Sequence, residues 1–301
     1  MPESQQETGY ISNQVQRVLI WLLVANVAVV IAKATAGWLA GSLSVMSDAA
    51  HSLTDSLNNI AGIVLIRLAT RPADWDHPYG HSKIEQIGAF GITGLMCLTA
   101  YEIGREAISG WWRGETHVVN ISTLTLGVMV GTLAVNIAVV WYERRAGQRL
   151  QSIFLIADAQ HTMSDIYVTI GVLSGLVFVK LGYVWIDRVV ALLVVCAIVY
   201  GAFNVVREAG SELMDTVAVD AKSLAQLASE LPDVVEVRDV RSRGRGMYGF
   251  VELTIVVDHN DLRRAHRSTE VLENNIRQKY NLHTVTIHIE PSGNEELRMK
   301  N

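Results

Sequence analysis

Residues 48–55 read Asp-Ala-Ala-His-Ser-Leu-Thr-Asp, and residues 158–165 read Asp-Ala-Gln-His-Thr-Met-Ser-Asp. Both lie inside long apolar segments and repeat the spacing Asp-x-x-His-x-x-x-Asp. An α-helix turns by about 100° per residue, so steps of three and four place the polar side chains of each motif on one face. Ionisable residues inside apolar spans indicate function, and two such faces turned toward each other predict a site for a small cation.

The composition indicates a membrane domain followed by a soluble one. Hydrophobic residues make up 50% of the 301 residues, and the mean hydropathy is +0.25. Residues 209–301 hold 12 of the 25 Lys and Arg and 15 of the 30 Asp and Glu. We therefore expect a transmembrane domain over residues 1–209 and a cytoplasmic domain over residues 210–301. The net charge of −5 forms no basic stripe, which argues against a nucleic-acid partner.

Six apolar segments are long enough to cross a bilayer, which needs about 20 residues. They are residues 18–40, 43–68, 84–108, 118–142, 150–180 and 187–207. One set of segment ends carries Arg17, Arg67, Arg71, Lys83, Arg144, Arg145, Arg149 and Arg207, and the opposite set only Arg113, Lys180 and Arg188. This excess of positive charge predicts that both termini are cytoplasmic.

The second and fifth segments are then antiparallel, because three connections separate them. At about 1.5 Å per residue, His51 with Asp55 and His161 with Asp165 both fall near the middle of a hydrocarbon core about 30 Å thick. We expect one site with two imidazole nitrogens and two carboxylate oxygens. This donor set suits tetrahedral Zn²⁺, and Cd²⁺, Co²⁺ and Fe²⁺ accept the same donors. Mg²⁺ or Ca²⁺ would require more oxygens.

Asp48, Asp158 and Lys33 are further ionisable residues in the predicted spans. The antiparallel arrangement places Asp48 on the outer side of the site and Asp158 on its inner side, so both are expected to flank it. Lys33, alone in the first span about 10 Å from its outer end, is expected to snorkel to the interface.

A second candidate cluster lies in the loop before the third segment, where residues 74–81 read Asp-Trp-Asp-His-Pro-Tyr-Gly-His. Pro78 and Gly80 favour a tight turn between the histidines, so Asp74, His77 and His81 are expected to converge on a metal. The alternative is a pair of solvated loop histidines.

The tail is expected to contain a helix at 221–231 capped by Asp220, strands at 234–240 and 250–257, a helix at 262–280 and a strand at 284–289. This αββαβ order predicts a small α+β domain in which two helices cover one sheet.

With these motifs the chain resembles the cation diffusion facilitator family, in its bacterial-type zinc/iron efflux branch. The resemblance rests on the paired His-x-x-x-Asp motifs, the six spans, the string Asp-His-Pro-Tyr-Gly-His-x-Lys ending at Lys83, and the αββαβ tail. It implies a homodimeric exporter in the inner membrane that exchanges divalent metal for protons by alternating access. Metal is then a transported substrate, no cofactor or catalysis is implied, and the tail is a metallochaperone-like dimerisation and regulatory domain.

The resemblance also assigns residues. The transport site falls on His51, Asp55, His161 and Asp165, and the loop site on Asp74, His77 and His81. Histidine as the first residue of the second-span motif is associated with zinc in this family. Lys83 and Asp215 match a charge interlock between the two domains.

Three tail residues, His266, His288 and Glu290, stand where the family often has metal ligands. Arg238 and Thr254 occupy positions where a histidine is common, and the positive charge of Arg238 would repel a second cation. We therefore expect one metal or none in the tail.

Two other functions remain open at this point. A non-transporting, metal-responsive membrane scaffold or sensor would need its best metal site in the tail. A membrane di-metal oxidoreductase would need clustered histidines, whereas nine are scattered over 301 residues. The choice among zinc, iron, cadmium and cobalt also stays open.

Overall fold

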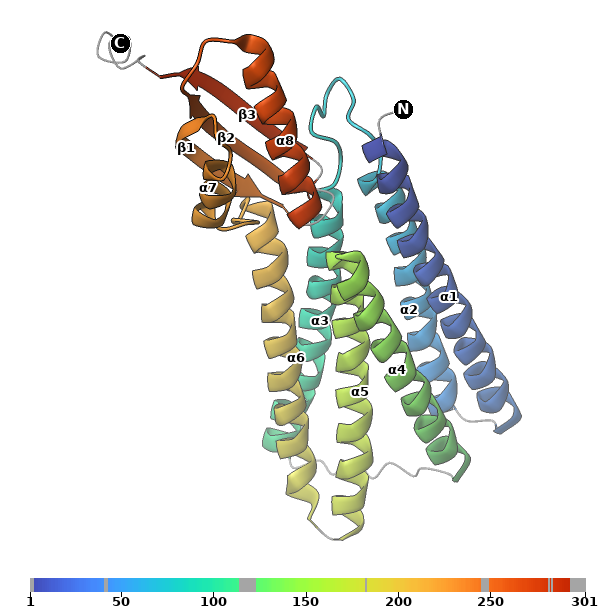
Figure 1. The fold of residues 1–301 in the computed structure, drawn as a ribbon. Coiled ribbons are helices and arrows are strands. Elements are labelled where there is room, and N and C mark those ends of the chain that lie inside the picture. Colours follow the sequence, from blue (N-terminus) through green and yellow to red (C-terminus); the bar gives the residue numbers. More distant parts are fainter. Residues whose placement is uncertain are drawn as a thin grey trace. The chain divides into compact units, whose positions relative to one another are not determined.

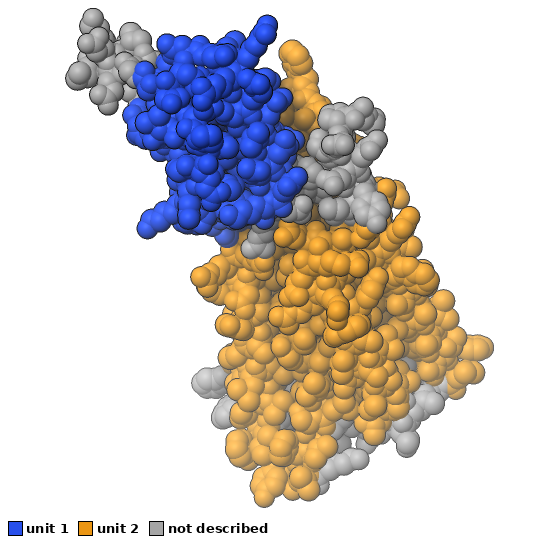
Figure 2. Space-filling model, viewed as in Figure 1, with its two compact units in different colours: residues 1–8, 210–301 blue, residues 9–209 orange. Residues whose placement is uncertain are grey.

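The computed structural model in Figure 1 describes residues 3–40, 43–113, 123–181, 183–244, 249–280, 282 and 284–292. Contacts along the chain divide it into two compact units, coloured in Figure 2. Residues 9–209 form one unit, and residues 1–8 with 210–301 form the other.

Six long helices build the larger unit: α1 Glu3–Ala40, α2 Leu43–Ala69, α3 Ile84–Arg113, α4 Thr123–Leu150, α5 Ile153–Lys180 and α6 Val184–Leu213. Four segments of the described residues are long and apolar enough to cross a membrane, namely Asn13–Leu39, Ile84–Ser109, Leu126–Leu150 and Arg188–Leu213. They belong to α1, α3, α4 and α6, whereas α2 and α5 carry the two His-x-x-x-Asp motifs. The predicted helical transmembrane bundle is confirmed.

Helix α4 runs beyond the predicted segment 118–142. It continues through Arg144, Arg145 and Arg149 to Leu150. The apolar pattern marks where the hydrocarbon ends, whereas the helix continues because arginine is a good helix former. Helix α4 therefore ends in a basic segment on the side that the charge distribution assigns to the cytoplasm.

Helix α5 packs against both α3 and α4, and its start is fixed by polar contacts. The Leu155 amide donates to the Ser152 hydroxyl at 3.3 Å, which makes Ser152 an N-cap. Glu85, in the first turn of α3, accepts hydrogen bonds from the Ser152 hydroxyl and, at 3.1 Å, from the Phe154 amide. Phe154 is itself buried in the helical core. These contacts fix α5 along its axis relative to α3.

The smaller unit contains α7 Ala221–Ser229, β1 Val234–Arg243, β2 Phe250–Val257, α8 Leu262–Tyr280 and β3 Thr284–Pro291. The sheet order is β1-β2-β3, with β1 antiparallel and β3 parallel to β2. Its core is formed by Leu224, Leu253, Ile255, Leu272 and Ile276, which the two helices and the sheet bury together. The Asp220 side chain accepts from the Ser223 amide at 3.2 Å and caps α7. The predicted αββαβ fold is confirmed.

Candidate metal centres

The first centre lies in the helical unit, where α2 contributes Asp55 and α5 contributes His161 and Asp165. One ligand atom from each residue lies within 4.8 Å of the others. The distance from His161 Nε2 to Asp55 Oδ1 is 3.5 Å. A tetrahedron with metal–ligand bonds of about 2.1 Å has edges of roughly 3.4 Å, so this distance fits two neighbouring ligands of one zinc ion.

His161 is only 7% exposed, and neither of its ring nitrogens has a hydrogen-bond partner of good geometry among the described residues. Buried polar groups are normally paired. The His161 imidazole, which lies beside two carboxylates, can therefore offer the lone pair of a ring nitrogen to a cation. The arrangement is that of a ligand set rather than of a completed hydrogen-bond network.

The structure brings together the three predicted ligands whose side chains it describes. His51 belongs to α2, but its side chain and that of Asp48 lie outside the described residues. His51 precedes Asp55 by four positions, which places both on one face of α2. Their roles stay a prediction.

A pair of buried carboxyls lies next to this centre. Asp158, one turn before His161, is 4% exposed, and Glu143 of α4 is 1% exposed. The Thr162 hydroxyl links the two positions, because it lies 3.5 Å from Glu143 Oε2 and 3.2 Å from the Asp158 carbonyl oxygen. Two carboxylates buried side by side repel each other. Such a pair is stable only if a cation lies nearby or if one of the two groups binds a proton. The pair therefore extends the polar region of the bundle from α5 to α4.

Sequence reasoning missed Glu143, because Trp-Tyr-Glu-Arg-Arg at residues 141–145 resembles the charged end of a span. A signal was present in the two small residues that follow. Ala146 and Gly147 are both buried, and a Cβ on Gly147 would lie 3.0 Å from Ile156 Cγ1. Small residues three and four positions after Glu143 mark the face of α4 that approaches α5 closely.

The position of Lys33 contradicts the prediction that its side chain snorkels to the interface. Its side chain is 6% exposed and donates a hydrogen bond to the Ser52 hydroxyl of α2 at 2.8 Å. It does not snorkel to the interface, because α2 supplies a polar acceptor within the bundle. The Lys33 amine of α1 thus contacts α2 at Ser52, one turn before Asp55.

The second centre lies in the loop between α2 and α3. The His77 Nδ1 atom lies 3.2 Å from Asp74 Oδ1, and His81 Nε2 lies 3.4 Å from Asp74 Oδ2. The two imidazole centroids are 4.3 Å apart. Gly80 has φ +81°, a conformation that glycine adopts without steric cost, and its amide donates to the His77 carbonyl at 2.9 Å. The turn brings all three predicted loop ligands together.

The Asp74 carboxylate is held in its charged form. It accepts hydrogen bonds from the backbone amides of His77 at 2.7 Å and Asp76 at 3.1 Å. The His77 backbone hydrogen bond in particular, helped by the nearby His81, lowers the pKa of Asp74 below its ordinary value. This group is therefore available as a metal ligand at neutral pH.

The three predicted tail ligands are not grouped into one cluster in the described part of the chain. His266 lies 3.5 Å from Glu270, one turn further along α8. His288 is highly exposed and lies 4.0 Å from Glu290, which also lies 3.7 Å from Arg238. Arg238, Thr254 and His288 stand in register across β1, β2 and β3. The arginine therefore pairs with Glu290, one of the three predicted ligands.

A different tail cluster, which sequence reasoning missed, joins Asp233, Asp258 and His259. Asp233 already has a cationic partner, because Arg264 donates to both of its carboxylate oxygens, with Nε 3.0 Å from Oδ2. The Ser268 hydroxyl donates to the same carboxylate at 3.1 Å. The Arg264 hydrogen bonds lower the pKa of Asp233 below its ordinary value. We interpret this cluster as a structural ion pair rather than a metal centre.

The predicted interlock involves Lys83 of the larger unit and Asp215 of the smaller one. Asp215 has φ +55° and accepts a hydrogen bond from Arg243 Nη1 at 3.1 Å. Its pairing with Lys83, which belongs to the other unit, stays a prediction.

Comparisons with known proteins cover both units. Residues 19–214 match the family model of the cation efflux transmembrane domain, and residues 218–292 match that of the cation efflux protein cytoplasmic domain, which supports dimerisation. An uncharacterised transporter of Methanocaldococcus jannaschii is 30% identical over 92% of this chain and 98% of its own length. The cation-efflux pump FieF of Shewanella oneidensis is 30% identical over 84% of this chain and 86% of its own. Metal tolerance protein C1 of Arabidopsis thaliana is 28% identical over 90% of this chain and 61% of its own length. The chain therefore belongs to the cation efflux family, the cation diffusion facilitators, whose members are multi-pass membrane transporters rather than enzymes.

Proposed function

We propose that this protein exports a divalent transition metal, zinc by preference, from the cytoplasm across the inner membrane in exchange for protons. Metal cation efflux is the activity of the family, whereas the metal and the coupling ion are our proposal. The observation that carries it is the convergence of Asp55, His161 and Asp165 at a buried position between two helices. Fe²⁺, Cd²⁺ and Co²⁺ accept the same donors and are the competing substrates.

Proton coupling follows from the chemistry of the ligands. Imidazole and carboxylate bind metal only when they are deprotonated, so protons and metal compete for one site. If the bundle exposes this site alternately to the two sides, metal leaving on one side is replaced by protons. We further propose that Asp158 and Glu143 form a second binding position for the transported ions on the inner side of the metal centre. The reason is that Asp158 lies one turn of α5 before His161.

The loop centre and the tail are assigned from the predicted topology. With both termini in the cytoplasm, the loop of Asp74, His77 and His81 faces the cytoplasm and holds a second metal. Residues 210–301 form the dimerisation domain. A metal-responsive scaffold is less well supported, because Arg264 occupies the Asp233 carboxylate in the tail cluster.

The test is metal flux in sealed proteoliposomes that contain the purified protein with its cytoplasmic face outward. An acidic lumen is expected to speed uptake of external Zn²⁺, and metal influx is expected to make the lumen more alkaline. Competition with Fe²⁺, Cd²⁺ and Mn²⁺ ranks the metals. Vesicles with Asp55→Asn report the background, and Asp76→Asn, an exposed loop carboxylate outside the metal clusters, is the matched control. Uptake that ignores the pH gradient and moves no protons would make the protein a uniporter.

A further inference from the structure

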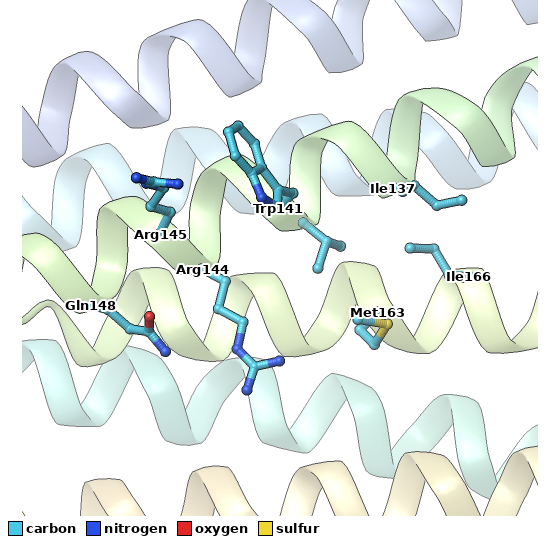
Figure 3. Close-up of a pocket in the computed structure, with 8 residues that line it drawn as sticks. Ile137, Trp141, Arg144, Arg145, Gln148, Met163 and Ile166 are labelled. Atoms are coloured by element: carbon cyan, nitrogen blue, oxygen red, sulfur yellow. The ribbon is translucent and has the colours of Figure 1, made fainter.

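We propose that an anionic phospholipid of the cytoplasmic leaflet binds in the pocket between α4 and α5, with its phosphate on Arg144 and Arg145. The pocket has a volume of about 560 Å³. This size lies within the range of pockets that bind small organic ligands. Figure 3 shows that its lining is divided, with Arg144, Arg145 and Gln148 toward one end and Ile137, Met163 and Ile166 toward the other.

The polar end offers two guanidinium groups that the protein leaves without a counter-charge. Arg144 and Gln148 make no hydrogen bond or ion pair among the described residues, and both are exposed. Arg145 lies 5.5 Å from the centre of the Trp141 ring, and this is its one contact of this kind in the described part of the chain. The neighbouring Glu143 is buried and makes no ion pair with either arginine among the described residues. Guanidinium groups bind phosphate through paired N–H donors.

The apolar end lies in the apolar segment 118–142 and the adjoining part of α5, whereas Arg144 and Arg145 follow the end of that segment. Ile137 is 52% exposed and Trp141 is 64% exposed. In a membrane these side chains contact acyl chains, and a tryptophan at this depth marks the headgroup boundary. The pocket thus has apolar walls below the interface and cations at the interface.

A single amphipathic anion satisfies both ends. A soluble anion would leave the apolar walls uncovered, and a zwitterionic lipid such as phosphatidylcholine would bring a quaternary ammonium, as well as a phosphate, close to the two guanidiniums. Basic pockets between membrane helices on the cytoplasmic side suit anionic headgroups. The charge complementarity therefore selects an anionic glycerophospholipid as the occupant.

The occupant would touch the helix that carries the metal ligands. Met163 and Ile166 flank Asp165 in the sequence of α5, and both line the pocket. Lipid binding depends only on the membrane position of α4 and α5, and not on the identity of the metal or on proton coupling. It can therefore be measured without transport.

The experiment uses the full-length protein in neutral detergent, with phosphatidylglycerol and phosphatidylcholine as probes and native mass spectrometry to count bound lipids. The wild type is expected to prefer phosphatidylglycerol by about tenfold or more, because each cation near a lipid surface contributes attraction to an anionic headgroup. R144Q/R145Q is expected to lose this preference. The matched control R149Q/R207Q removes two exposed arginines from the same side of the membrane, outside the pocket, and is expected to keep it.

A competition measurement on the wild type distinguishes the two sources of phosphate. Glycerol 3-phosphate at millimolar concentration is expected to leave the bound phosphatidylglycerol in place. Displacement by this soluble anion would overturn the proposal in favour of a simple phosphate site. Equal retention of the two lipids by the wild type, or equal loss of preference in both double variants, would also overturn it.

Discussion

Replacing Asp55 with asparagine tests the metal centre most directly. Asparagine keeps the shape and one oxygen of the side chain but removes its negative charge. In the structure this carboxylate lies 3.5 Å from the imidazole of His161, so any cation on that imidazole is also adjacent to Asp55. We expect Asp55→Asn to abolish export while the dimer remains folded.

The size of the effect can be bounded. Changing a group that only supports a metal ligand costs 10- to 100-fold in affinity, so losing a charged ligand itself should cost at least about 100-fold. This corresponds to about 2.8 kcal/mol, since each tenfold is about 1.4 kcal/mol. Asp55→Glu is a complementary change, because it keeps the charge but moves the carboxylate by about 1.5 Å. Metal sites tolerate deviations of about 0.2 Å, so this variant should also fail.

The assay is Zn²⁺ uptake into proteoliposomes, followed with an internal fluorescent indicator, together with metal binding measured by calorimetry. Binding is measured in a background with His77→Ala and His81→Ala, so that the loop centre does not contribute. Asp76→Asn controls for the loss of a carboxylate, and Asp48→Ala is expected to reduce transport less than Asp55→Asn. If Asp55→Asn vesicles take up zinc at near the wild-type rate, the assignment of this centre is wrong.

Three further predictions concern selectivity and the tail. His51→Asp is expected to raise the ratio of Mn²⁺ to Zn²⁺ flux, because oxygen donors favour harder cations, and an unchanged ratio would mean that geometry sets the choice. Residues 211–301 alone are expected to dimerise and to bind zinc weakly or not at all, whereas two tight zinc ions per protomer in calorimetry would contradict this. Arg264→Ala is expected to lower the Tm of the tail at pH 7. Because the pKa of Asp233 is lowered, the contribution of the Asp233–Arg264 ion pair to the stability of the tail is complete above the ordinary carboxyl pKa of about 4. This contribution disappears as the pH falls through the lowered pKa. The variant should therefore lose less Tm than the wild type between pH 7 and pH 3, and parallel pH profiles would show that the ion pair does not stabilise the fold.

Much of the fold was predictable from local patterns. The apolar segments and the αββαβ order correspond to the observed helices and strands, because helix and strand periods depend on neighbouring residues in the chain. The pairing of Asp55 with His161 was also predictable, since two spans with matching motifs at matching depth leave few other arrangements. The turn at Gly80 likewise follows from local chemistry, and it brings Asp74, His77 and His81 together.

The contacts that sequence reasoning missed all join residues distant in the chain. Glu143 meets Asp158 only because α4 packs against α5 at Gly147, and Lys33 reaches Ser52 only because α1 lies beside α2. From the sequence alone, Glu143 resembles the charged end of a span and Lys33 resembles a snorkelling lysine.

The sequence by itself therefore determined the type of each element, the face of each helix on which the candidate ligands lie and the donor atoms that they offer. The tertiary structure decided which buried charges compensate each other. In the tail, for example, it placed Arg264 on Asp233. The physical reason is that helical periodicity fixes the direction of a side chain within its own element, whereas its partner depends on how close two elements can approach. That distance is set by the packing of small and large side chains over the whole unit.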